Sequence, residues 1–221
     1  MTLIFMKTAA LVIAALVHAK EPRKGTAIPY VIHPVHVAAI LQRHQYGEPV
    51  VIAGLLHDVL EDIDYDDGWL QVAMRATFPQ ADLPPRVVDG AAYRPIFTRF
   101  LHAEVGDDVF TLVQGMTEPK NDGGPRRNWR ERREMILDRL RSGSGDLVAL
   151  KAADVLHNVQ SIAEDISHHG ATVLGRFTAS PTDTLWYYSS VAAIVRERLG
   201  AAPIATEVTQ AVELLEPLVS G

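Results

Sequence analysis

The helical spacing of the apolar residues, which recurs along the whole chain, is the feature that most constrains its fold. Strands are poorly supported, because few stretches alternate apolar and polar residues and the β-branched runs are short. With 221 residues, 48% of them hydrophobic, the chain is long enough to bury one sizeable core. The pattern therefore predicts an all-α protein, folded as a single domain over residues 1–221.

Helix boundaries follow from the residues that usually begin and end helices. Pro34, Pro49 and Pro181 suit first turns, and Gly143 with Gly145 marks a gap between two helices. The expected helices span residues 3–20, 33–45, 48–62, 67–77, 106–116, 127–141, 145–166, 182–199 and 204–218. Residues 79–104 hold four prolines and are of mixed character, so we expect an irregular insertion there, with at most a short helix.

The apolar N-terminus has some of the composition of a signal peptide, with small residues near a possible cleavage point. Lys7 interrupts the apolar run, and the uninterrupted stretch is too short for a membrane span. We therefore interpret this segment as a buried first helix.

Composition limits the partners of the protein. The chain has no cysteine, so a bound metal must be held by histidine and carboxylate ligands. The same absence fits a reducing cytoplasm, which is the location we expect. The formal net charge of −6 disfavours non-specific nucleic-acid binding. We expect a small-molecule partner, no nucleic acid and no membrane, and homo-oligomerisation stays open.

The strongest chemical signal is the segment GLLHDVLED at residues 54–62. The preceding apolar run indicates a buried helix, and a buried run that ends in His57 and Asp58 needs a partner for its polar groups. Glu61 lies one turn beyond His57, and Asp62 lies one turn beyond Asp58. Carboxylates this close to a divalent cation can orient or deprotonate a bound water. For Glu61 or Asp62 alone, a solvated acidic helix end would be the better interpretation.

A further carboxylate lies far along the chain, in ALKAADVLHN at residues 149–158. Asp154 sits on an expected buried helix, where an unpaired charge is costly. It is either a metal ligand or the partner of Lys151 in a buried salt bridge. Asn158 continues the same helix face, and we expect His157 in the core or beside the ligands rather than among them.

The third candidate segment is YVIHPVHVA at residues 30–38. His33 is a candidate ligand, but His36 lies one turn further on and competes with it. A lone histidine before proline is usually a cap or a surface group. The position of the two residues on the helix does not choose between them.

Positive charge is concentrated in two places of this net negative chain. Arg23 and Lys24 lie in a loop before the third segment. A denser run comprises Lys120, Arg126, Arg127, Arg130, Arg132 and Arg133. Guanidinium groups can bind phosphate bidentately or stack on a base, so both places are candidate anion sites, although a solvated helix face explains most of the arginines. The aromatic residues at 186–188 are expected mostly in the core, with one tyrosine available to line a pocket for a planar ring.

These segments together resemble the HD-domain metal-dependent phosphohydrolases, and more closely their alarmone-hydrolase branch. That branch contains the hydrolase domain of the RelA/SpoT proteins and small stand-alone hydrolases. The resemblance covers about residues 5–199 and rests on RK, GT, HP, HDVLED, ERRE, KAADVLHN and WYY occurring in this order. The HD pair alone is a weak motif, but its combination with HP upstream and KAAD downstream is specific. The resemblance implies an HD-domain helical bundle around a single buried metal site.

The resemblance also implies a role for each candidate residue. The implied ligands of one metal, usually manganese, are His33, His57, Asp58 and Asp154. The pair implied to activate or position the attacking water is Glu61 and Asp62. The implied nucleotide contacts are Arg23 and Lys24 beside the guanine, Lys151 and Asn158 around the ribose and phosphates, and Tyr187 near the nucleotide. The implied reaction removes the 3′-pyrophosphate from (p)ppGpp and gives GDP or GTP.

Two departures from the family pattern concern the choice of substrate. Gly25 stands where an acidic residue commonly follows the RK pair, and Asp183 or Thr184 stands where a basic residue is usual. Two alternatives therefore stay open: a hydrolase of another nucleotide or phosphorylated dinucleotide, and a non-catalytic nucleotide sensor. The intact ligand set, together with Glu61 and Asp62, favours catalysis over the sensor.

Overall fold

The structure, a computed structural model, describes residues 3–118 and 127–220. Its α-helices are α1 (Leu3–Val17), α2 (Ile32–Arg43), α3 (Glu48–Leu56), α4 (Val59–Asp62), α5 (Gly68–Thr77), α6 (Gly90–Met116), α7 (Trp129–Ser142), α8 (Gly145–His169), α9 (Pro181–Leu199) and α10 (Pro203–Ser220). A 3₁₀ helix, η1 (Ala171–Arg176), follows α8. No β-strand forms within the described ranges, so the predicted all-α bundle is confirmed. Two residues of the basic run, Lys120 and Arg126, lie outside these ranges.

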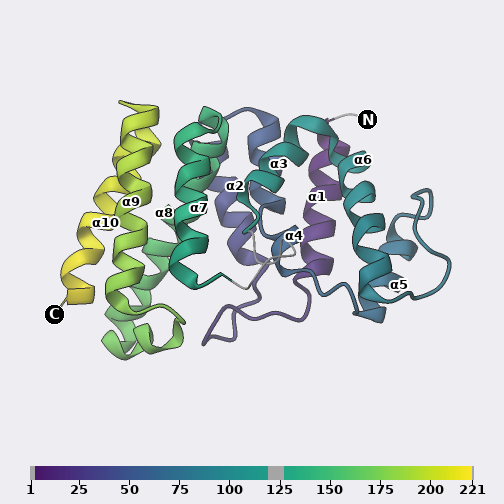
Figure 1. Cartoon of the computed structure of the whole chain (residues 1–221), viewed down its shortest axis with the longest axis horizontal. Coiled ribbons are helices and arrows are strands. Elements are labelled where there is room, and N and C mark those ends of the chain that lie inside the picture. The colour runs from purple at the N-terminus through teal and green to yellow at the C-terminus, as the bar shows by residue number, and fades with distance from the viewer. Residues whose placement is uncertain (1–2, 119–126, 221) are drawn as a thin grey trace.

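The helices form an elongated bundle, with α9 and α10 at one end and α5 and α6 at the other (Figure 1). The first helix packs against α3, α5 and α6 and buries Ala10, Ile13 and Ala14, which confirms the expected buried first helix. Across the residues described, no helix combines the length and the apolar character needed to cross a membrane.

Two helices of the bundle are buried along a continuous stretch. In α8 every residue from Leu147 to His157 is buried, because α2, α3, α6, α9 and α10 surround it. In α3 every residue from Val50 to Leu56 is buried. A helix that is apolar on all sides belongs in the core. Polar side chains at these positions are therefore held inside the protein rather than in solvent.

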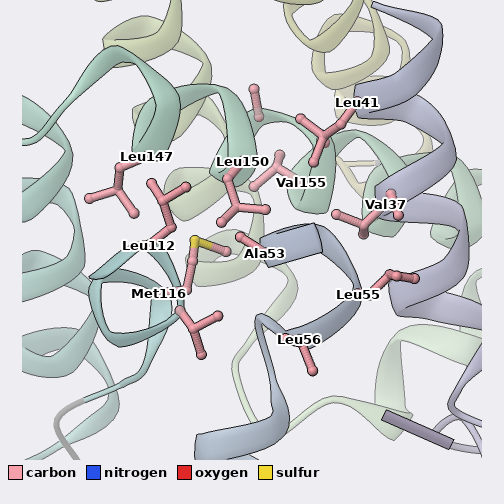
Figure 2. Close-up of a cluster of buried hydrophobic side chains, with 14 of the residues drawn as sticks. Val37, Leu41, Ala53, Leu55, Leu56, Leu112, Met116, Leu147, Leu150 and Val155 are labelled. Carbon is pink, nitrogen blue, oxygen red and sulfur yellow. The ribbon is translucent and has the colours of Figure 1, made fainter. Parts of the chain in front are cut away.

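Figure 2 shows the apolar cluster that joins these helices. Ala53 of α3 and Leu150 of α8 lie near Met116 of α6, and Val37 and Leu41 of α2 lie on the other side of the cluster. Methyl and thioether groups fill the space between four helices, so the ends of α3 and α8 are fixed relative to each other. This packing positions the polar residues that follow the apolar runs.

The irregular insertion expected at residues 79–104 is wrong for most of its length, because α6 begins at Gly90. Tyr93, Phe97 and Phe100 are buried at helical spacing, and this signal was concealed by the prolines around it. Pro95 is accommodated inside the helix, and the backbone breaks from helical geometry at Gly106, where φ is 77°. Between α5 and α6, the irregular backbone is confined to residues 78–89.

The single helix expected over residues 48–62 is divided into α3 and α4. His57 follows the last residue of α3, and Asp58 precedes the first residue of α4 with φ −97° and ψ −9°. The helix expected over residues 106–116 is the second part of α6, and the remaining expected helices agree with the structure to within a few residues at each end.

The loop between α1 and α2 contains a tight turn at residues 23–26. The Thr26 amide donates to the Arg23 carbonyl at 2.9 Å, and an isolated bridge pairs Pro22 with Pro29. Gly25 has φ 76°, a conformation that favours glycine, and a Cβ there would overlap the side chain of Arg176. The glycine that departs from the family pattern is therefore required by this turn.

Candidate metal centre

Four side chains from three parts of the chain meet inside the bundle. His33 Nε2 lies 3.2 Å from His57 Nε2 and 3.2 Å from Asp154 Oδ1. Asp58 Oδ2 lies 3.0 Å from His57 Nε2 and 3.6 Å from His33 Nε2. The histidines are 2% and 1% exposed, and Asp154 is 7% exposed. One atom each of His33, His57 and Asp154 therefore lies within 4.8 Å of the others at a buried point, and Asp58, which is half-buried, contacts the two histidines of this group.

The electrostatics of this cluster favour a cation. His57 Nδ1 donates to the Gly54 carbonyl at 2.9 Å, so its Nε2 is the nitrogen that faces the cluster. Burial alone would lower the pKa of His57, but Asp58 and then Asp154 raise it to about 9. In the absence of a metal the cluster thus holds a proton. Two imidazoles and two carboxylates form a donor set that suits a divalent metal, which would replace that proton.

His36, the competitor of His33, does not reach the cluster. It is exposed on α2, and its Nδ1 lies 2.8 Å from His157 Nε2. His157 in turn places its Nδ1 2.7 Å from His33 Nδ1. The buried face of α2 therefore presents His33 to the cluster. His157 lies between His33 and His36, next to the cluster as expected.

Asp154 has both of the partners that the sequence offered. Its Oδ2 accepts a hydrogen bond from Lys151 Nζ at 2.8 Å, and its Oδ1 accepts one from Asn158 Nδ2 at 2.7 Å. Burial would raise the pKa of Asp154, but the Lys151 charge and His33 hold it well below its usual range. The carboxylate is therefore ionised, with one oxygen paired to Lys151 and the other turned toward the imidazoles.

Tyr30 belongs to the site and was not singled out from the sequence. Its hydroxyl donates to Asp58 Oδ2 at 2.7 Å, and its ring packs against His18 and His33 with centroid distances of 4.8 and 5.6 Å. Burial and the nearby Asp58 charge raise the pKa of Tyr30, so the phenol stays protonated and remains a donor. No local pattern marks this tyrosine, because its partner is distant in the sequence.

The predicted carboxylate pair lies beside the cluster. Glu61 and Asp62 border a cavity of about 170 Å³ that is also lined by Tyr30, His33, Asp58, Met116, Arg133, Lys151, Asp154 and Asn158. Glu61 Oε2 accepts a hydrogen bond from the Glu118 amide at 3.0 Å. Asp62 also lies near His18 and Glu21, with one ligand atom from each residue within 4.8 Å of the others. A water in this cavity would have carboxylates on one side and the imidazole cluster on the other.

A larger cavity of about 540 Å³ adjoins the small one and shares five of its residues. The shared residues are Glu61, Arg133, Lys151, Asp154 and Asn158. Among its other lining residues are Lys24, Trp129, Arg132, Phe177 and Tyr187. Lys24 Nζ donates to Thr178 Oγ1 at 3.1 Å. The Tyr187 hydroxyl is buried without a hydrogen bond to the described residues, so it is available to a ligand.

Arg133 joins the two cavities and was also not singled out within the basic run. Its guanidinium lies 4.9 Å from the ring centre of Tyr187 and 5.5 Å from that of Trp129. Its Nη1 lies 3.6 Å from Glu118 Oε1. Burial would lower its pKa, but Tyr187 and Glu118 raise it, so the group stays charged. The only signal in the sequence was its place in the ERRE segment, which did not separate it from its neighbours.

Arg23 lies apart from this cavity. Its Nη1 donates to His157 Nδ1 at 3.1 Å, and its Nη2 donates to Asn158 Oδ1 at 3.2 Å. It borders a separate cavity of about 390 Å³, together with His36 and His157. Arg23 and Lys24, adjacent in the sequence, therefore serve different cavities, and the contact of Arg23 with a guanine stays a prediction.

This fold and site are similar to those of HD-domain proteins. Residues 10–81, which contain His33, His57 and Asp58, match the HD domain family. The fold extends beyond that segment, because 96% of the chain aligns with 94% of the structure of a metazoan orthologue of SpoT, with a TM-score of 0.61 and 20% identity. A structure from Listeria monocytogenes aligns over 83% of this chain and 97% of its own, with a TM-score of 0.57 and 27% identity.

A curated relative points to the same group of proteins. The guanosine-3′,5′-bis(diphosphate) 3′-pyrophosphohydrolase of Aquifex aeolicus is 28% identical over 145 residues, which are 66% of this chain. The chain covers 16% of the length of that enzyme. The resemblance to the HD domain of RelA/SpoT-type proteins is thereby confirmed.

Proposed function

We propose that the protein is a metal-dependent phosphohydrolase that removes the 3′-pyrophosphate of (p)ppGpp, giving GDP or GTP and pyrophosphate. One observation carries the proposal. A small cavity beside the cluster of His33, His57, Asp58 and Asp154 adjoins, at Glu61, a larger cavity lined with cationic and aromatic side chains. The names of the relatives support the same substrate.

The proposed metal ligands are the four residues of the cluster, and the proposed metal is manganese, although other divalent cations suit the same donors. A divalent cation held there would supply Lewis-acid activation of a water and of a phosphoryl oxygen. The contacts of this chain hold the ligands in place before any metal binds. Lys151 fixes Asp154, Tyr30 fixes Asp58, and the Gly54 carbonyl fixes His57.

The remaining residues of the small cavity have distinct proposed roles. Glu61 accepts a proton from the attacking water, and Asp62 orients that water. Lys151 and Arg133 lie on the side of the larger cavity and neutralise the negative charge that develops on the phosphate groups. Their positive charges are held by neighbours that burial keeps in place, so little reorganisation is needed during the reaction.

The larger cavity is the proposed nucleotide site. Its volume of about 540 Å³ lies within the range usual for small-molecule sites. Tyr187 offers a ring face and a free hydroxyl to the nucleoside, while Lys24, Lys151 and Asn158 face the ribose and phosphates. Arg23 would contact the guanine only if the base reached the other side of Asn158. We place this activity in the cytoplasm, in keeping with the absence of cysteine.

Hydrolysis of another nucleotide is the second candidate. Thr184 is 8% exposed and borders the larger cavity, at one of the positions where the family usually has a basic residue. One fewer cation in the nucleotide site favours a substrate with a different number or position of phosphates.

The test is hydrolysis by the purified protein with Mn²⁺ over a panel of ppGpp, pppGpp and a dinucleotide carrying a 2′- or 3′-phosphate. Products are separated by ion-exchange chromatography. We expect GDP and pyrophosphate from ppGpp, loss of both on adding EDTA, and recovery on adding Mn²⁺. Absence of pyrophosphate release, or undiminished release by Asp154→Ala, contradicts the proposal. Preferred turnover of the dinucleotide supports the second candidate, and nucleotide binding without turnover identifies a sensor.

A further inference from the structure

The guanidinium of Arg23 is the starting point of two hydrogen-bonded paths that lead into the metal cluster. Nη1 donates to His157 Nδ1 at 3.1 Å, and Nη2 donates to Asn158 Oδ1 at 3.2 Å. His157 and Asn158 are neighbours on α8, and each contacts a different residue of the cluster. The planar fork of one arginine thus spans the two residues that support His33 and Asp154.

The first path determines the tautomer of His157. A guanidinium can only donate hydrogen bonds, and Arg23 Nη1 lies closer to His157 Nδ1, at 3.1 Å, than to Nε2, at 3.5 Å, so Nδ1 is the acceptor. The proton of the neutral ring is then on Nε2, which donates to His36 Nδ1 at 2.8 Å. A doubly protonated ring has no lone pair to accept from Arg23, so this contact belongs to the neutral ring. The one lone pair of His157 Nδ1 also faces His33 Nδ1 at 2.7 Å, so the two contacts share it.

The tautomer of His33 follows from that of His157. Because His157 Nδ1 accepts, His33 Nδ1, which lies 2.7 Å away, must be the donor. The lone pair of a neutral His33 is then on Nε2, the nitrogen that faces His57 and Asp154. A metal requires a lone pair on this nitrogen, and the hydrogen bond made by the other ring nitrogen determines which one carries it.

The second path orients the carboxylate of the cluster. Arg23 requires the amide oxygen of Asn158 on its side, which leaves the amide nitrogen to donate to Asp154 Oδ1 at 2.7 Å. This is the oxygen that lies 3.2 Å from His33 Nε2. The hydrogen bond from Arg23 therefore determines which way the Asn158 amide is oriented, and that amide in turn holds Asp154 Oδ1 in place.

We propose that Arg23 is a positioning residue of the metal site, which selects the binding tautomer of His33 through His157 and aligns Asp154 through Asn158. The inference rests on the metal site of the proposed function. It differs from a contact with the guanine base, because it predicts an effect on the metal in the absence of any nucleotide.

The experiment compares Arg23→Ala with Lys24→Ala, which removes the same charge from the next residue but touches neither His157 nor Asn158. Mn²⁺ binding is measured by titration calorimetry without nucleotide. We expect the Mn²⁺ dissociation constant of Arg23→Ala to rise about 10- to 100-fold, as is usual when a group supporting a ligand is removed. Lys24→Ala should bind Mn²⁺ like the wild type. Arg23→Lys, which keeps the charge but lacks the planar fork, should fall between them.

A second readout uses the metal-free protein, so that it does not depend on hydrolysis. Nitrogen-15 shifts of the imidazole rings should show His33 protonated on Nδ1 and His157 on Nε2 in the wild type, and mixed tautomers of both in Arg23→Ala. The proposal is overturned if wild-type His157 carries its proton on Nδ1, or if Arg23→Ala keeps wild-type Mn²⁺ affinity. A raised KM with unchanged Mn²⁺ affinity would assign Arg23 to the base instead. Failure of the wild type to hydrolyse ppGpp would leave both readouts intact.

Discussion

The cluster of His33, His57, Asp58 and Asp154 lies next to the larger cavity, yet the two regions are built differently. The candidate ligands lie on α2, α8 and the break between α3 and α4, and His57, Asp58 and Asp154 each have a hydrogen-bond partner from the chain. The cavity is lined from α4, α7, α8, α9 and three loops, with long side chains such as Lys24 and Arg132, and the Tyr187 hydroxyl has no hydrogen bond to the described residues.

We infer from this difference that the cluster serves the chemical step, whereas the larger cavity selects the substrate. A change at the cluster disturbs the packing of several helices, whereas a change at the cavity wall alters one surface that meets the ligand. We therefore expect substitutions in the cluster to abolish metal binding, and substitutions in the cavity wall to change KM while leaving the metal in place. Three substitutions test this division.

The largest effect is expected from Asp154→Asn. It removes a ligand charge and leaves the buried Lys151 without its partner. We expect no measurable Mn²⁺ binding, hydrolysis lowered by more than about 10⁴-fold, and a free energy of unfolding lowered by about 3–5 kcal/mol. Calorimetry and urea unfolding measure these changes. The matched double variant Asp154→Asn/Lys151→Met should recover most of the stability but not the metal, and wild-type Mn²⁺ affinity in either variant would contradict the ligand role.

Glu61→Gln should have the next largest effect, and it tests the boundary between the two regions. Glutamine keeps the shape and can still accept from the Glu118 amide, but it cannot take a proton from water. We expect kcat to fall about 10²- to 10⁴-fold at unchanged Mn²⁺ affinity. Steady-state kinetics with a parallel Mn²⁺ titration separate the two quantities, and an unchanged kcat would move the role of base to Asp62.

The smallest effect is expected from Tyr187→Leu in the wall of the larger cavity. Loss of a stacking ring costs about 1–3 kcal/mol per base, which corresponds to a KM for ppGpp raised roughly 5- to 150-fold. We expect kcat and Mn²⁺ affinity to stay near wild type. Tyr187→Phe is the control that keeps the ring; if it raises KM as much as leucine does, the hydroxyl and not the ring makes the contact.

The same division explains what could be predicted from the sequence. His57 and Asp154 follow apolar runs, so their burial could be predicted before any fold was known. His33 and His36 lie one turn apart on one helix, and only the packing of α2 on α8 distinguishes them. Local patterns thus indicated the burial of these candidate ligands, but not the choice between His33 and His36, because the two neighbours share the same pattern.

The parts that were missed depend on long-range packing. Tyr30 and Arg133 meet partners far away in the sequence, so no spacing rule could mark them. Residues 90–104 were expected to be irregular because of local prolines, but the burial of aromatic residues on one helix face outweighs the lost backbone hydrogen bond at Pro95. Lys24 lines the larger cavity, whereas Arg23, on the other side of the turn at residues 23–26, lines a separate cavity.

The charges that surround the small cavity have a consequence for the order of events. Its lining holds four carboxylates against Lys151 and Arg133, and even a proton on His57 leaves the balance negative. A polyanionic nucleotide is repelled by such a cavity, while a divalent cation that replaces the proton brings the balance to zero. We therefore expect ordered addition, with the cation arriving first and the nucleotide second, and no retention of ppGpp by chelator-treated protein.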